Sequence, residues 1–268
     1  MARAHRHFVA GQIWHLTHRC HQRQFLLKFA RDRQAWMGWL FEARKRFGLC
    51  VLDYMVTSNH IHLLLYDGEG REVIPNSMQL VAGRSGQEYN QRKHRRGAYW
   101  EDRYHATAVE AGEHFRQCLQ YIDMNMVRAG VVADPEEWAD CGYLEIQHPK
   151  VRWRIIDEEQ LINLARVDSR ATLQQLCREQ VKAALERKLV GRQSHWTESV
   201  AVGSPEYIEA LQKQLRVRGK GRKRLAVEGG YQLKEAESAY RGLSGGQKGD
   251  LSPENTLFWN QSLRAAMP

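Results

Sequence analysis

The sequence predicts an α+β fold: an antiparallel, ferredoxin-like sheet with helices packed on one face, followed by a mainly helical C-terminal appendage. Two observations predict it. Segments with the character of strands and segments of helical periodicity follow one another in the order strand, helix, strand, strand, helix, strand, with one further helix. After about residue 150 helical and basic segments take over. We therefore expect residues 1–150 to form the sheet-bearing domain and residues 151–268 a helical, basic C-terminal extension.

Four segments are expected to be strands. In the first, Trp14 and Leu16 lie on one face and His15 and Thr17 on the other, as in a strand with one face in the core. The second and third are apolar and flank a short turn, which predicts a hairpin. The expected strands are 11–20, 49–56, 60–66 and 103–110.

The helices follow from apolar residues at spacings of three and four. Trp36, Leu40 and Ala43 form such a stripe, and Gly48 is expected to end their helix. Another stripe begins at Phe115 and has its stop signal at Gly130. The expected helices are 29–47, 77–93 and 113–127, with 155–164 and 173–190 in the extension.

Charge and cysteine content limit the functional classes. The chain has 268 residues and a net charge of +9, with 40 Lys and Arg against 31 Asp and Glu, which favours a polyanionic partner such as nucleic acid. No segment approaches the roughly 20 apolar residues of a membrane span, and no signal-peptide core follows the N-terminus. The five cysteines form no C-x-x-C pair, which argues for reduced thiols in a cytoplasm and against a zinc knuckle or disulfide framework.

The run Ser58-Asn59-His60-Ile61-His62-Leu63-Leu64-Leu65 carries the strongest functional signal. Because side chains alternate along a strand, His60 and His62 project on one face while Ile61 packs on the other. Two adjacent imidazoles suit a divalent cation better than a core, although a hydrogen-bonded structural pair is the alternative. His15 and His18 are three apart and face opposite sides, so both cannot join this site. One could neighbour it, but we expect a structural role.

Two polar residues of the helix 113–127 are candidates to complete the site. Tyr121 and Asn125 are four apart and therefore lie on one helix face. Asn125 offers an amide oxygen, a hard ligand suited to Mg²⁺ or Mn²⁺. Tyr121 offers a phenolic oxygen that becomes a nucleophile when a nearby cation or base ionises it. The alternative is a partly buried aromatic beside a solvated amide.

A first basic cluster, residues 92–96, is followed by aromatic residues and Arg103, and this combination indicates where a nucleic acid would bind. The alternative, at Trp100 and Tyr104, is a solvated turn with aromatic side chains in the core. Charges track phosphates while aromatic rings stack on unpaired bases. A second basic run, Lys213–Arg224, has seven basic residues and no acidic one, and is expected to add salt-sensitive, sequence-independent affinity. The candidate phosphate contacts of the first cluster are Arg92, Lys93, Arg95, Arg96 and Arg103.

The strings SNHIHLLL, GAYWEDRYHATAVE and YIDMNMVRAGVV resemble the three signature segments of the single-tyrosine HUH transposases. The resemblance is to the branch of REP-associated tyrosine transposases, which process repetitive extragenic palindromes, and it covers roughly half the chain. It implies an HUH nuclease core in residues 1–150, with Tyr121 as nucleophile and His60, His62 and Asn125 as metal ligands. The family usually has Asn-Pro-Val where this chain has Asn-Met-Val from Asn125 on, a change that removes no catalytic atom.

The resemblance implies an enzyme that cleaves and rejoins single-stranded or hairpin DNA through a 5′-phosphotyrosine, with Mg²⁺ or Mn²⁺ as cofactor. It also implies a bacterial, cytoplasmic, nucleoid-associated protein that can form a homodimer and has no membrane partner. A transposase that has lost turnover and is kept as a palindrome-binding protein or regulator is the alternative. The histidine-triad hydrolases also carry His-x-His, but they need a third histidine where this chain has Leu64.

Overall fold

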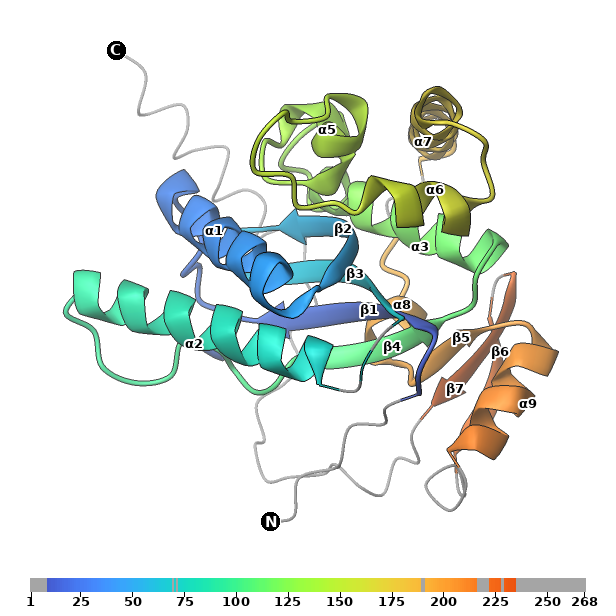
Figure 1. Ribbon diagram of the computed structural model, residues 1–268, viewed down its shortest axis with the longest axis horizontal. Coiled ribbons are helices and arrows are strands. Elements are labelled where there is room, and N and C mark those ends of the chain that lie inside the picture. The colour runs from blue at the N-terminus through green and yellow to red at the C-terminus, as the bar shows by residue number, and fades with distance from the viewer. Residues whose placement is uncertain are drawn as a thin grey trace.

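The computed structural model describes residues 9–68, 70, 72–188, 191–215, 222–227 and 229–234. Its fold is α+β, with one mainly antiparallel sheet and helices on both of its faces (Figure 1). The strands are β1 Gln12–Arg19, β2 Cys50–Val56, β3 His60–Asp67, β4 His105–Val109, β5 Ala201–Gly203, β6 Lys223–Val227 and β7 Gly230–Lys234. The helices are α1 Ala30–Phe47, α2 Val73–Arg92, α3 Glu113–Asp123, α4 Asn125–Arg128, α5 Gly142–Gln147, α6 Glu158–Ala165, α7 Arg170–Glu186, α8 His195–Glu198 and α9 Pro205–Gln214.

The first four strands and two helices follow the expected β-α-β-β-α-β order. β3 pairs antiparallel with both β1 and β2, and β1 pairs antiparallel with β4, so β1 and β3 are central. α1 ends at Gly48, whose φ of 69° is the left-handed conformation expected of a helix-ending glycine. α2 begins four residues before the expected position, with Pro75 inside its first turn, where a missing N–H leaves no helical hydrogen bond unmade.

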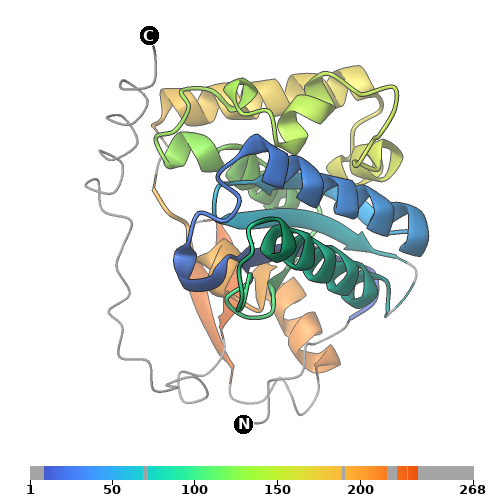
Figure 2. The same ribbon diagram turned by 90° about the vertical axis from the view of Figure 1, so that its left-hand side faces the viewer.

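Helices α1 and α2 pack side by side on one face of the sheet (Figure 2). Trp100 lies near them on the same side, because its ring stacks on His18 and its Nε1 donates to the carbonyl of Ala82 in α2. α3 packs on β2 and β4, and its Tyr121 contacts the ring of His15, which points to the opposite face from His18. The two sheet faces therefore differ: α1 and α2 cover one face, and α3 packs on the other. The expectation that the helices lie on one face is correct for α1 and α2 but not for α3, because the polar face of β1 and β3 is also covered.

The extension after residue 150 adds both helices and strands. α6 and α7 pack on each other and on α3. The short strand β5 pairs in parallel with β4, and β7 and β6 continue the sheet from it, so the strand order is β2-β3-β1-β4-β5-β7-β6. Its described residues are mainly helical, as expected, but the strands β5, β6 and β7 were not predicted from the sequence. Among the described residues, no helix is both long and apolar enough to cross a membrane.

Candidate active site

The two histidines of β3 lie on the sheet face that receives α3. Their ring centroids are 5.0 Å apart with planes at 73°. The register places His60 opposite Arg19 and His62 opposite Thr17 of β1, while Ile61 between them belongs to the fully buried core. The alternation expected for this strand therefore brings the two imidazoles together on one face.

The turn before β3 fixes the orientation of His60. Its Nδ1 lies 2.7 Å from Oδ1 of Asn59 and 2.9 Å from Oγ1 of Thr57, and that hydroxyl also donates to the carbonyl of His60. An amide oxygen only accepts, so Nδ1 carries the proton and Nε2 keeps its lone pair. Burial, assisted by the positive charge of Arg19 and Arg128, lowers the pKa of His60 to about 3. The side chain is therefore neutral at physiological pH, as a metal ligand must be.

His62 faces Asn125 across the site. Nδ2 of Asn125 lies 3.0 Å from Nε2 of His62, which is 2% exposed. Burial and the neighbouring rings of His60 and His15 lower the pKa of His62 well below its usual value. The two neutral imidazoles and one amide thus converge from β3 and α4.

Tyr121 projects from α3 against the same histidines. Its ring centroid lies 6.1 Å from those of His62 and His15, both in edge-on arrangements, and the residue is 6% exposed. The guanidinium carbon of Arg128 lies 3.9 Å from the centroid of the phenol ring. Burial raises the pKa of the Tyr121 hydroxyl, and the charges of Arg128 and Arg192 oppose that rise. The phenol is therefore protonated at rest, with a cation placed to stabilise its ionised form.

The donor set fits a divalent cation. His60 and His62 are neutral, and Asn125 can present its carboxamide oxygen after rotation of the amide. Among the described residues no group of three or more His, Cys, Asp or Glu side chains is placed to hold a metal ion. The further donor that faces His62 is the amide of Asn125. The amide oxygen is a donor that Mg²⁺ and Mn²⁺ prefer, and the three residues include no thiolate that would favour a softer ion.

Two further residues belong to this cluster: one that the sequence already allowed as a neighbour of the site, with a structural role expected, and one that it did not indicate. His15 lies on β1 with Nε2 2.8 Å from Nδ1 of His62, beside the candidate ligand rather than apart from it. The signal was the strand alternation, which put His15 on the polar face with Thr17. Arg128 is the other, and it follows Asn125 by only three residues.

Arg92 and Arg95, two of the five predicted DNA-contacting residues, make polar contacts with other side chains of the protein. Arg92 forms an ion pair with the buried carboxylate of Asp32. Nη1 of Arg95 donates to Oδ1 of Asn90 at 3.0 Å. Both side chains are half-buried at the C-terminal end of α2. Their contacts give them structural roles, whatever else they bind.

The other three, Lys93, Arg96 and Arg103, are exposed. The segment 94–104 lies along the end of the sheet that carries His60, because the N–H of Glu101 donates to the carbonyl of Arg19, the partner of His60 in β1. The segment is thus hydrogen-bonded to the end of β1 that pairs with His60, although it lies far from His60 in sequence. The predicted run Lys213–Arg224 lies partly outside the described residues. Its described ends contact Glu209, Lys213 at 2.8 Å and Arg224 at 3.9 Å.

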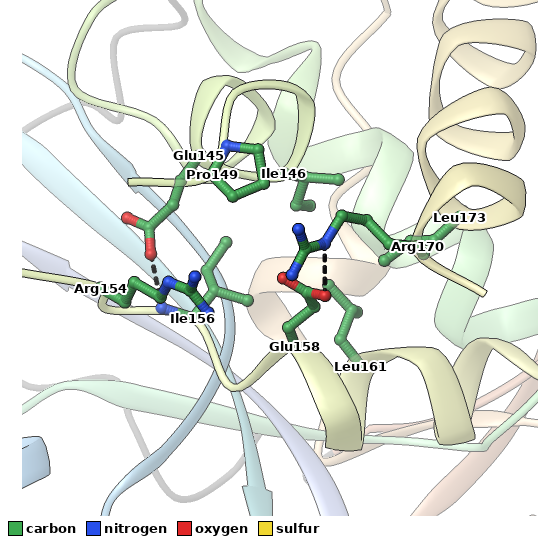
Figure 3. A pocket seen from close by; sticks show the side chains of 9 residues that line it. All are labelled: Glu145, Ile146, Pro149, Arg154, Ile156, Glu158, Leu161, Arg170 and Leu173. Atoms are coloured by element: carbon green, nitrogen blue, oxygen red, sulfur yellow. Dashed lines mark hydrogen bonds and ion pairs between the residues drawn. The ribbon is translucent and has the colours of Figure 1, made fainter. Parts of the chain in front are cut away.

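A separate small cavity lies between α5, α6 and α7 (Figure 3). Its volume of about 20 Å³ suffices for about one water molecule. Figure 3 shows the ion pair of Arg170 with Glu158 on one side and Glu145 on the other, where Oε1 accepts from the N–H of Ile156. These polar groups satisfy one another, and the cavity shares no residue with the histidine cluster.

Comparison with known proteins gives one family match. Residues 9–125 match the family model described as IS200-like transposase. No curated protein matches the chain. One similar solved structure is a REP-associated tyrosine transposase bound to a REP hairpin, with 16% identity and a TM-score of 0.47 over 59% of this chain and 94% of that one. Another is a proposed transposase from Deinococcus radiodurans R1, with 23% identity and a TM-score of 0.33 over 46% of this chain and 96% of that one. The segment matched by the family model contains His60, His62, Tyr121 and Asn125.

Proposed function

We propose a function for a chain whose residues 9–125 belong to the family of IS200-like transposases. The proposed function is the cleavage and rejoining of single-stranded DNA, at hairpins formed by palindromes, with Tyr121 as the nucleophile. One observation carries it: a tyrosine from α3 meets a pair of histidines from β3, with ring centroids 6.1 Å apart for Tyr121 and His62 and 5.0 Å apart for the two histidines.

His60, His62 and Asn125 would hold the divalent cation, Mg²⁺ or Mn²⁺. A cation bound there would neutralise the negative charge that grows on a non-bridging oxygen of the scissile phosphodiester. The support for this set is the neutrality of both imidazoles and the 3.0 Å contact between Asn125 and His62.

The protein would supply the nucleophile. The Tyr121 oxygen loses its proton and bonds to phosphorus, the bond from phosphorus to the 3′ oxygen breaks, and that oxygen gains a proton. The product is a 5′-phosphotyrosine and a free 3′-hydroxyl. The new bond is again a phosphodiester, so a 3′-hydroxyl can reverse the step without ATP, and cleavage and strand joining are the same reaction in two directions.

Arg128 is the residue best placed to assist ionisation of the phenol. Its guanidinium carbon lies 3.9 Å from the ring centroid, and its charge lowers the pKa of a hydroxyl that burial otherwise raises. Contact with a cation across an aromatic face is worth about 0.5–2 kcal/mol. Arg128 would therefore stabilise the phenolate as it forms.

Single-stranded or hairpin DNA is the proposed partner. The net charge of +9 favours a polyanion, and the exposed Lys93, Arg96 and Arg103 would contact phosphates near the end of the sheet that carries His60. Arg92 and Arg95, which already have protein partners, would act mainly by holding this segment in place.

A strand-specific adduct assay tests the proposal. A library of hairpins with randomised single-stranded flanks is labelled at the 3′ end or at the 5′ end and incubated with the full chain and Mn²⁺. We expect an adduct that survives denaturing electrophoresis and carries the 3′ label only, since the DNA on the 3′ side of the nick retains the phosphate bound to tyrosine.

Tyr121→Phe should abolish this adduct while hairpin binding stays within a few-fold of wild type. Tyr231→Phe, at a residue 38% exposed on β7, is the matched control and should form adducts normally. Hairpin binding without any adduct in the wild-type chain would instead support the alternative, a DNA-binding protein that has lost turnover.

A further inference from the structure

A chain of hydrogen bonds joins the candidate metal ligand His62 to the C-terminal extension. Nδ1 of His62 lies 2.8 Å from Nε2 of His15, and Nδ1 of His15 lies 2.8 Å from the carbonyl oxygen of Trp196. The two imidazoles are stacked, with centroids 5.1 Å apart and planes at 11°. His15 is completely buried. The carbonyl of Trp196, which is 181 positions from His15 in sequence, therefore restricts the orientation of the His15 ring.

The position of each proton along this chain follows from the groups at its two ends. The Trp196 carbonyl can only accept, so Nδ1 of His15 must carry a hydrogen. At the other end of the chain, Nδ2 of Asn125 lies 3.0 Å from Nε2 of His62, and an amide nitrogen can only donate. Nε2 of His62 therefore accepts and carries no hydrogen, so the hydrogen of His62 is on Nδ1. Because Nδ1 of His62 donates across the 2.8 Å contact, Nε2 of His15 is the acceptor.

The segment that supplies the carbonyl is firmly attached to β4. The carbonyl of Ser199 accepts from Oγ1 of Thr107 at 2.7 Å, and the N–H of Ala108 donates to the carbonyl of Val200 at 2.9 Å. Trp196 itself is 1% exposed, and its indole N–H donates to Gln193. The acceptor for His15 is therefore part of a packed element, as an orienting group must be.

We propose that His15 is a positioning residue through which the C-terminal extension fixes the tautomer of His62, so that Nε2 of His62 is unprotonated and directed at the candidate cation site. Metal-binding histidines commonly donate their second N–H to a carbonyl or carboxylate. In this site the acceptor for His62 is His15, which is itself hydrogen-bonded to the carbonyl of Trp196. The metal-binding half of this inference rests on the proposed function, whereas the tautomer does not.

The tautomer is tested first, by long-range ¹H–¹⁵N correlation spectra of the metal-free full chain labelled with ¹⁵N-histidine, with His62 assigned by its loss in His62→Gln. We expect the Nδ1–H form at His62 in wild type. His15→Gln should preserve it, because one amide supplies both a donor and an acceptor. His15→Leu should convert His62 to a mixture of forms. A wild-type His62 protonated on Nε2 would overturn the inference without any variant.

Metal binding is tested next, by isothermal titration of the same chains with Mn²⁺. His15→Leu should weaken binding by about 10- to 100-fold, as loss of an orienting partner does, while His15→Gln stays close to wild type. His18→Leu, in the same strand but facing the opposite side, controls for loss of a buried histidine. Equal weakening by His15→Leu and His18→Leu, or none by either, would overturn the proposal. If wild type binds no Mn²⁺ while His62 has the expected tautomer, the proposed function fails and the hydrogen-bond chain stands.

Discussion

Asp53 offers a test of the packing beneath the site, because its carboxyl group should make folding stability depend on pH. It is completely buried on β2, opposite Leu64 and hence on the sheet face that carries His62. Burial, and then the neighbouring carboxyl of Asp123, raise the pKa of Asp53 well above its usual value. The folded chain therefore retains a proton that the unfolded chain releases above about pH 4.

The sign and size of the effect follow from this difference. Where the folded state binds one proton more than the unfolded state, the free energy of unfolding falls by about 1.4 kcal/mol for each pH unit of increase. The loss begins near the unfolded pKa of about 3.9 and ends at the raised folded pKa. Asp53→Asn cannot ionise, so its stability relative to wild type should grow by about 1.4 kcal/mol per pH unit across that window.

Urea unfolding followed by tryptophan fluorescence at half-unit steps from pH 5 upward measures this difference. Comparison with wild type cancels the opposite contribution of His15 and His60, whose lowered pKa values of about 3 reduce stability as the pH falls below about 6.5. Asp102→Asn, at an exposed position, controls for the loss of one negative charge. A difference between Asp53→Asn and wild type that does not change with pH would refute the assignment of a buried, protonated carboxyl.

Two further predictions concern the site itself. His60→Ala or His62→Ala should remove both Mn²⁺ binding in isothermal titration and metal-dependent cleavage. Asn125→Ala should weaken binding and cleavage less, because water can replace a neutral amide ligand. Unchanged cleavage by the double histidine variant in excess Mn²⁺ would refute the ligand assignment. Arg128→Ala should slow adduct formation by about 2- to 30-fold, the rate equivalent of a contact worth 0.5–2 kcal/mol, with little change in hairpin affinity. Arg128→Lys should form the adduct at a rate between those of wild type and Arg128→Ala. A loss confined to DNA binding would mean that Arg128 contacts phosphate rather than supports Tyr121.

Much of the fold could be predicted because its first half follows strong local rules. Alternation placed His60 and His62 together, and helical spacing with a terminal glycine gave α1 and its end at Gly48. The strands of the extension had no such signal. β5 is only three residues long, Ala201–Gly203, and its pairing with β4 arises from a contact distant in sequence. β6 begins with Lys-Arg, which in sequence belongs to a basic run and not to an alternating strand.

In the candidate site too, contacts between residues distant in sequence could not be predicted. Tyr121 and Asn125 could be paired from their spacing in one helix, and the structure splits that helix at Met124 without separating them from the histidines. The contact of His15 with Trp196 joins residues 181 positions apart, and no local pattern predicts it. Arg92 was read as a surface cation because its buried partner, Asp32, comes from a different helix.

Mapping the residue that becomes linked to DNA is the most direct test of the central claim. The full chain is incubated with 3′-labelled hairpin DNA and Mn²⁺, the adduct is digested with protease and nuclease, and the modified peptide is sequenced by tandem mass spectrometry. The proposed mechanism predicts a nucleotide attached through its 5′ phosphate to Tyr121. A nucleotide on any other residue, or a 3′-phosphate linkage at Tyr121, would contradict it.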